Sequence, residues 1–169
     1  VVTGGFALWV LFAFEKSDAG FQFTSQHEWI KPWGISWHLG IDGISLFLVV
    51  LTGVLFPLVL AGIDPHSRST ADHKRYLSWM LLLEAGVLGS FISLDLFLFF
   101  VFFEIVLVPM YFLIGGWGYE NRVYAATKFF LFTMVGSAFM LVGIIATAVL
   151  AKADDGQITF DLIKIAENA

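Results

Sequence analysis

The sequence contains no cysteine among its 169 residues. Disulfide bonds, thiol nucleophiles and the usual cysteine ligands of iron–sulfur clusters are therefore excluded on this chain, and any electron transfer would fall to other chains. Charged residues are also scarce, at 14% of the chain, whereas soluble proteins average about 25%. The polar surface that a soluble globule needs is missing.

Motifs for soluble chemistry are absent as well. The chain has no dinucleotide fingerprint, no GxSxG and no HExxH, and the glycines of GGWG at residues 115–118 precede no GK[ST]. The net charge of −5 opposes binding to nucleic acid or to an anionic lipid surface, because both select basic patches. We therefore expect no cofactor and no metal on this chain, and no nucleic acid as a partner.

Apolar residues are abundant instead, at 59% of the chain with 17% aromatic. A helix needs about 20 apolar residues to cross a bilayer, and four stretches supply them: 41–62, 76–94, 95–115 and 122–150. The last would be about 43 Å long, so it must tilt or protrude. The sequence predicts an all-α, polytopic bundle of four full transmembrane helices plus part of a fifth.

The remaining segments lie outside these spans. Residues 1–14, about 21 Å long as a helix, are too short to span, and we expect them to be the end of a truncated transmembrane helix. Residues 15–40 form an extracytoplasmic loop, in which the alternation of FQFTSQHEWI favours a strand or hairpin. Residues 151–169 predict a surface loop with a short amphipathic helix, whose apolar face would contain Leu162, Ile163 and Ala166.

Basic residues suggest the orientation in the membrane. Arg68, Lys74 and Arg75 crowd the short loop between the first two spans, and Arg122 lies on the same side. Lysines on the other side are spread over longer, acid-rich connections. The excess of positive charge in short loops marks the cytoplasmic side, so we expect this loop to face the cytoplasm.

An acid, Glu104, lies at the middle of DLFLFFVFFEIVLVPMY. An ionised group there costs about 2.5 to 3.5 kcal/mol, so such residues are usually functional. Pro109, five residues later, removes a backbone donor and crowds the carbonyl of Ile105, which bends the helix and leaves a polar group beside the acid. The alternative is a protonated packing residue next to an ordinary kink.

Two more ionisable residues lie inside spans. Glu84 is central in its helix, and Lys128 lies about 9 Å from the cytoplasmic end of its own. Glu104 and Lys128 would differ in depth by about 8 Å on adjacent helices, so a water bridge or another lysine is the better partner for Glu104. Alternatively, Glu84 makes a hydrogen bond between two helices, and Lys128 reaches to the surface.

Some residues suggest helix starts and helix contacts. His38 and Asp42, four apart, would share a helix face at the mouth of the first span, as an interface pair or a cap. Asp42 and Asp95 each begin a helix, where an acid is stabilised by the positive end of the helix dipole.

The short SLD hinge at residues 93–95 requires an antiparallel pair of helices. Small residues permit close helix approach: Gly86 with Ser90, Ala85 with Gly89, and Gly136 to Ala138.

Three segments resemble a known family: WHLGIDGISLFLVVLT, LLLEAGVLGSFISLDLFLFFVFFEIVLVPMYFLIGGWG and AATKFFLFTMVGS. They closely resemble the chain M (subunit 4) family of antiporter-like membrane subunits in proton-pumping NADH:quinone oxidoreductase, respiratory complex I. The resemblance implies proton translocation, with Glu104 as the essential acid, Glu84 as the acid one helix earlier and Lys128 as the lysine of AATKFF. The family's partner lysine for Glu104 lies on a later helix, which this sequence does not reach.

The resemblance also implies partners. NADH, FMN, iron–sulfur clusters and quinone would be bound by other subunits, and the direct partners would be membrane-arm subunits and the bilayer, in a bacterial plasma membrane. Two alternatives stay open: a subunit of the related multisubunit cation/proton antiporter, and a structural subunit without an ion path. Replacement of Glu104 by Gln separates the structural alternative, and co-purifying subunits separate the other two.

Overall fold

A computed structural model describes residues 2–15, 20–62, 70–151 and 158–168. The described chain is mainly helical, with one β-hairpin. Its elements are α1 (Val2–Ala13), β1 (Gln22–Ile30), a 3-10 turn (Lys31–Trp33), β2 (Ile35–Ile41), α2 (Gly43–Ala61), α3 (Thr70–Ile92), α4 (Leu96–Trp117), α5 (Arg122–Leu150) and α6 (Leu162–Asn168).

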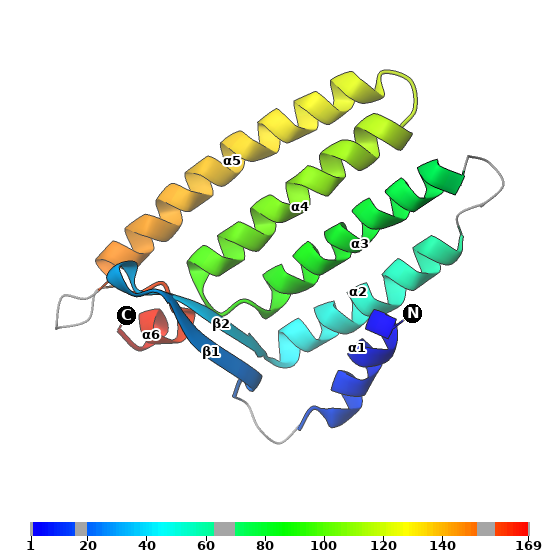
Figure 1. Cartoon of the computed structure of the whole chain (residues 1–169). Helices are drawn as coiled ribbons and strands as arrows, with labels where there is room; N and C mark the ends of the chain where they lie inside the picture. The colour runs from blue at the N-terminus through cyan, green and yellow to red at the C-terminus, as the bar shows by residue number, and fades with distance from the viewer. Residues whose placement is uncertain (1, 16–19, 63–69, 152–157, 169) are drawn as a thin grey trace.

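Four long helices, α2 to α5, lie side by side in chain order (Figure 1). Each is long and apolar enough to cross a membrane, over Gly43–Ala61, Asp72–Ile92, Leu96–Trp117 and Arg122–Leu150. The predicted helical bundle with four full spans is confirmed. The helix α3 begins six residues before the predicted span, because the polar segment TADHKR continues the helix beyond its apolar part.

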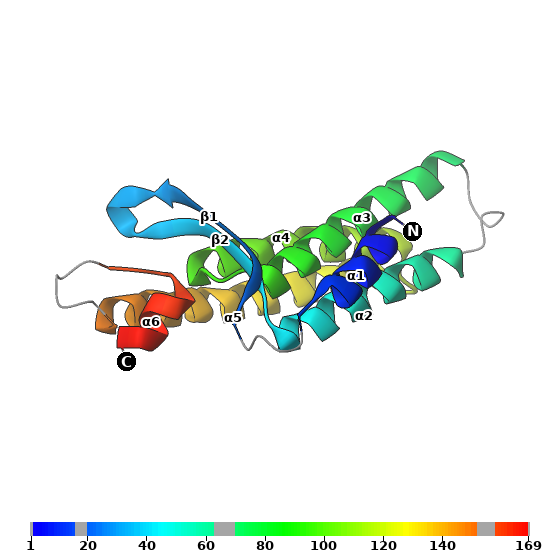
Figure 2. The same ribbon diagram turned by 90° about the horizontal axis from the view of Figure 1, so that it is seen from below.

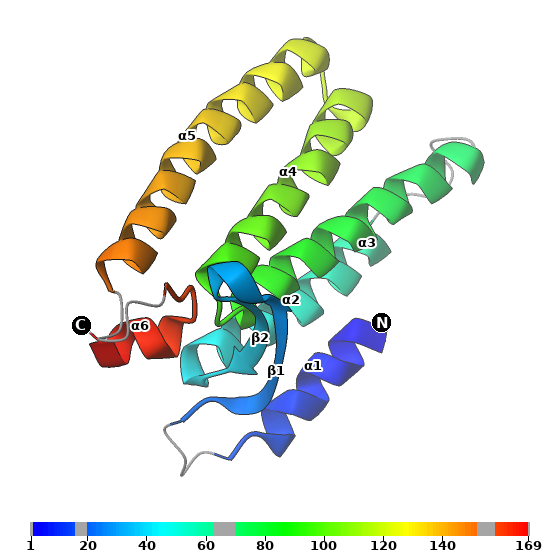
Figure 3. The same ribbon diagram turned by 60° about the vertical axis from the view of Figure 1, so that its left-hand side comes forward.

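The short helix α1 packs against α2 through glycine (Figure 3). A Cβ on Gly4 would lie 2.5 Å from the Gly53 carbonyl oxygen, and one on Gly53 would lie 2.6 Å from Ala7 Cβ. Both positions therefore exclude any side chain. This contact was not predictable from a spacing within one helix, because Gly4 and Gly53 lie on different helices.

The polar connection contains the expected hairpin. Strands β1 and β2 pair antiparallel, with Ser25 opposite Leu39 and Glu28 opposite Ser36. The hairpin and α6 lie at the same end of the bundle (Figure 2). Gly34 closes the 3-10 turn with a φ of 65°, and a Cβ there would meet the Ile158 carbonyl oxygen. Only glycine fits, because the backbone is left-handed and closely approached.

Helices α3 and α4 form the predicted antiparallel pair. A Cβ on Gly86 would lie 2.8 Å from Val106 Cγ2, and one on Gly89 would overlap the Phe102 ring. Gly86 and Gly89 are therefore at the predicted helix contact, whereas Ala85, predicted to share it, is exposed. On α5, Ser137 is buried whereas Gly136 has open space around it, so only part of that predicted group faces α4.

A short helix, α6, follows the last long one, as expected. Its apolar face differs from the prediction. Ile163 and Ile165 are half-buried, whereas Leu162 and Ala166 are exposed. Phe160, immediately before the helix, is buried in a cluster with Ile35, Ile144 and Ala148. The residue before α6, rather than the predicted apolar face of the helix, therefore supplies the buried contact with the bundle.

Candidate functional site

Glu104 lies on the face of α4 that contacts α5. Tyr111, seven residues later, packs its ring 5.6 Å from that of Phe130, and a Cβ on Gly115 would touch Ala126. Seven residues make almost two whole turns of an α-helix, so Glu104 and Tyr111 share a face. Glu104 itself is half-buried.

A buried hydroxyl lies level with this acid. The two helices are antiparallel, so each step back along α4 from Tyr111 corresponds to a step forward along α5 from Phe130. Glu104 is therefore level with Ser137, which is 4% exposed. The Ser137 hydroxyl now donates to the Met134 carbonyl at 3.0 Å. Glu104 and Ser137 together place two polar side chains at one depth of an otherwise apolar interface.

One oxygen of the Glu104 carboxyl group lacks a hydrogen-bond partner among the described residues. Its Oε1 atom is buried, and no described residue bonds to it. Pro109 lies inside α4 and is itself buried. Because proline has no N–H, the Ile105 carbonyl also loses its usual donor. Glu104 Oε1 and the Ile105 carbonyl oxygen are therefore both able to accept a hydrogen bond from a water molecule.

Glu84 is buried on a different face. It is 3% exposed, and its Oε1 also has no partner among the described residues. It precedes Gly86, which contacts α4, by two residues, or about 200° around the helix. Glu84 therefore points away from α4, and the two acids do not share one interface. The hydrogen bond that we considered between α3 and a neighbouring helix is not formed by this oxygen.

Lys128 lies on the outward face of α5. Ala126 and Phe130, two residues to either side, mark the contact with α4, so Lys128 points in nearly the opposite direction. Its Nζ lies 5.8 Å from the centre of the Tyr124 ring, within the range of a cation–π contact. Within the described chain, Lys128 forms no ion pair with Glu104 or Glu84, since it points away from α4.

The predicted pairing of His38 with Asp42 is wrong. His38 lies on strand β2, not on a helix, and four residues of a strand span about 13 Å. Asp42 instead caps α2 by accepting a hydrogen bond from the Ser45 N–H at 2.7 Å. This is the alternative that we predicted, in which Asp42 begins a helix. His38 Nδ1 lies 2.9 Å from Asp161 Oδ2. The two residues have separate partners.

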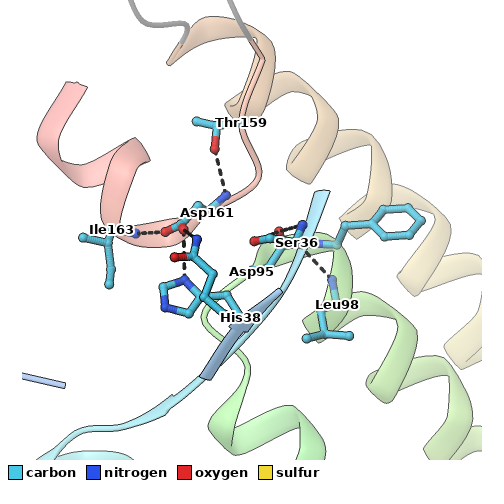
Figure 4. Close-up of polar contacts among 9 residues, drawn as sticks. Ser36, His38, Asp95, Leu98, Thr159, Asp161 and Ile163 are labelled. Atoms are coloured by element: carbon cyan, nitrogen blue, oxygen red, sulfur yellow. Dashed lines mark hydrogen bonds and ion pairs between the residues drawn. The ribbon is translucent and has the colours of Figure 1, made fainter. Parts of the chain in front are cut away.

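A polar cluster at the hairpin end was not predicted (Figure 4). Asp95 was expected to open α4, and its Oδ1 does accept from the N–H groups of Phe97 and Leu98. Its Oδ2 accepts from Ser36 N and Oγ, at 2.8 and 3.2 Å. Asp161 similarly joins His38 to α6. The alternation of β2 could have indicated that Ser36 and His38 share a face.

Comparisons with known proteins agree with this arrangement. A family model described as "NADH:quinone oxidoreductase/Mrp antiporter, TM" matches residues 93–168. NADH-quinone oxidoreductase subunit M of Rickettsia bellii is 44% identical over 140 residues, covering 82% of this chain and 28% of that protein. A chain of respiratory complex I from Thermus thermophilus aligns over 98% of this chain and 33% of its own length, with 29% identity and a TM-score of 0.79.

A chain of the Mrp complex from Dietzia sp. DQ12-45-1b shares the fold, with a TM-score of 0.75 and 22% identity over 92% of this chain and 16% of that one. The bundle and these matches define an integral membrane protein of the antiporter-like class. Residues 93–168 match the NADH:quinone oxidoreductase/Mrp antiporter membrane family, and the curated relatives that resemble most of this chain are subunit M proteins. It spans about 30% of their length.

Proposed function

We propose that this chain is part of the proton-translocating membrane subunit of an NADH:quinone oxidoreductase, and that Glu104 accepts and releases the transported proton. One observation carries the proposal: Glu104 has a buried carboxyl oxygen without a partner, in the middle of a membrane-spanning helix. A group that can alternate between charged and neutral in the bilayer suits proton transport.

The surroundings of Glu104 give this role a mechanism. Ser137 can turn its hydroxyl toward the acid, and the Ile105 carbonyl freed by Pro109 can bind water beside it. Protonation removes the cost of holding a charge there, and deprotonation requires a compensating charge. Lys128 points outward, so the compensating group belongs to a segment outside the residues described. Glu84 is a second proton site, on the other face of α3.

The proposed partners follow from the relatives. NADH, FMN, iron–sulfur clusters and quinone would be held by other subunits of the complex. Other membrane-arm subunits and the lipid would contact this chain, in a bacterial plasma membrane. The chain would contribute the ion path, and the energy would come from quinone reduction elsewhere.

The test is Glu104→Gln in the full-length subunit, assembled in its complex and reconstituted into vesicles. Gln keeps the size but cannot carry a proton as a carboxyl group does. Proton uptake per NADH oxidised is expected to fall by about a hundredfold, the usual scale for removing a proton-transfer group. The matched control is Glu120→Gln, on the exposed turn between α4 and α5, which should transport normally.

Normal transport by Glu104→Gln in an assembled complex would leave only the structural role. A second candidate is a subunit of a multisubunit cation/proton antiporter, favoured by the shared fold of the Dietzia Mrp chain. Proton exchange that depends on an added cation, without quinone-reducing subunits in the purified complex, would support it over the oxidoreductase.

A further inference from the structure

Three distant chain segments are joined at the hairpin end of the bundle: β2, the connection between α3 and α4, and the stretch before α6. Leu94 N donates to the His38 carbonyl at 2.9 Å, and Leu162 N donates to the Leu94 carbonyl at 2.8 Å. Leu96 N donates to the Phe160 carbonyl, also at 2.8 Å. The start of α4 is therefore bonded through its backbone to both neighbours.

Side chains reinforce this junction. Asp95 is 0% exposed, and its two carboxylate oxygens accept hydrogen bonds from different elements. Oδ1 caps α4, whereas Oδ2 accepts both hydrogen bonds from Ser36. One carboxylate thus ties the first turn of the helix to the hairpin. Four donors and the positive end of α4 stabilise its charge without a cation.

Asp161 makes the same kind of link to α6. Its Oδ1 accepts from Ile163 N at 3.0 Å, and its Oδ2 lies 2.9 Å from His38 Nδ1. Gln26, on β1, donates to the same oxygen at 3.1 Å. Ser36, His38, Asp95 and Asp161 are all buried, and we call these four residues the hairpin joint (Figure 4).

We propose that the hairpin joint fixes the position and rotation of α4, and that Asp95 is therefore a positioning residue for Glu104. The proposal rests on the proposed function. Glu104 is nine residues from Asp95, about 14 Å along a helix that transmits displacement directly. The remaining contacts of α4 are largely made by apolar side chains, including Phe102 against Gly89, and such contacts are less directional than hydrogen bonds. Hydrogen bonds with a single geometry are what define its register.

Asp95→Asn tests this role specifically. Asparagine is as good a helix cap as aspartate, but its amide N–H₂ would face the two donors of Ser36. The side chain of residue 95 then no longer accepts from Ser36, while the cap and the backbone bond from Leu94 to His38 can remain. In the assembled complex we expect proton uptake per NADH oxidised to fall about tenfold, since misplacing a reacting group by about 1 Å can cost up to about a hundredfold.

Asp42→Asn is the matched control. Asp42 caps α2, which carries no proposed proton site, and its carboxylate bonds to Ser45 within its own helix. The same chemical change there should leave proton uptake at the parent level. A fall of equal size in both variants would show that the effect is general loss of helix stability, and would overturn the proposal.

A disulfide between β2 and the α3–α4 connection should compensate for the lost hydrogen bonds between Asp95 and Ser36. Leu39 and Ser93 form an isolated antiparallel pair, and the neighbouring bond from Leu94 N to the His38 carbonyl marks it as the close type, with Cα atoms about 4.5 Å apart. That spacing suits a disulfide, and the chain has no other cysteine. In Asp95→Asn with Leu39→Cys and Ser93→Cys, oxidation should restore at least half of the lost uptake, and reduction should abolish the gain.

Each result decides the question. Parent-level uptake in Asp95→Asn overturns the proposal, as does a loss that the oxidised cysteine pair does not restore. If Asp95→Asn does not assemble, Ser36→Ala replaces it, because it removes only the weaker bond. Normal transport by Glu104→Gln would instead overturn the proposed function. In that case the rate of disulfide formation between the cysteines introduced at positions 39 and 93 still tests the hairpin joint, because Asp95→Asn should slow it if Asp95 holds α4 to the hairpin.

Discussion

Buried oxygens without partners distinguish Glu84 and Glu104 from the other buried acids of the described chain. Asp95 and Asp161 are as buried as Glu84 and more buried than Glu104, yet each accepts several hydrogen bonds. Several hydrogen bonds hold such a carboxylate in place, whereas an oxygen without a partner is open to a new donor, such as a water molecule. At the residue scale, the acids therefore divide into two that bond to the fold and two with an unpartnered oxygen, and the second two are the proton sites that we propose.

Ser137→Ala should impair transport without stopping it. The hydroxyl lies level with Glu104, and loss of one hydrogen bond costs about 1 kcal/mol, or about fivefold in rate. Proton uptake in reconstituted vesicles measures the effect. Ser78→Ala, which removes an exposed hydroxyl that also bonds to its own helix, is the control. An equal response of the two variants would mean that Ser137 only serves its helix.

Asp42 should make folding stability depend on pH in the acid range. The Ser45 side chain and the Ser45 N–H hold the pKa of Asp42 below its ordinary value of 3.8. A lowered pKa adds stability above that ordinary value, and this stability is lost as the pH falls through the lowered value. Asp42→Ala should therefore cost about 1 kcal/mol at pH 7, and less below pH 3.8. Denaturant unfolding in detergent at both pH values checks this; a constant difference would contradict it.

At the scale of elements, the packing of α3 on α4 depends on glycine. Gly89→Ala would place a Cβ against the Phe102 ring, so we expect a loss of about 1 to 3 kcal/mol from overpacking. Gly136→Ala, where the described chain leaves open space, should be neutral or stabilising, because alanine favours helix. Denaturation of the subunit in detergent compares them. Equal stabilities would refute the close contact.

The elements also show what a sequence can and cannot reveal. The four spans, the α3–α4 pair and the hairpin were predictable, because length, apolar content and alternation are local properties. The partner of His38 was not: Asp161 lies 123 residues away, and no local pattern connects a strand to the start of α6. Glu104 was recognisable from its position in an apolar run, but the face it occupies required the register of α4 against α5.

For the whole molecule, the hairpin and the turn between α4 and α5 lie at opposite ends of the bundle (Figure 1). Predicted orientation places the hairpin outside and the turn in the cytoplasm. Because the chain lacks cysteine, Tyr119→Cys, at a position 96% exposed, and Ser25→Cys can be labelled separately. An impermeant thiol reagent should modify position 119 only in inside-out vesicles and position 25 only in right-side-out ones. The reverse pattern would invert the assignment.

The connection between α3 and α4 consists of three residues, Ser93 to Asp95. So short a tip leaves no room for one helix to settle in the bilayer before the other begins to emerge, and their backbones are satisfied only as helices in lipid. The two helices must therefore enter the membrane together during synthesis. Asp95 crosses with that tip after the hairpin strand has been made but before α6 has, so the acid that later organises this end must cross before one of its two neighbours exists.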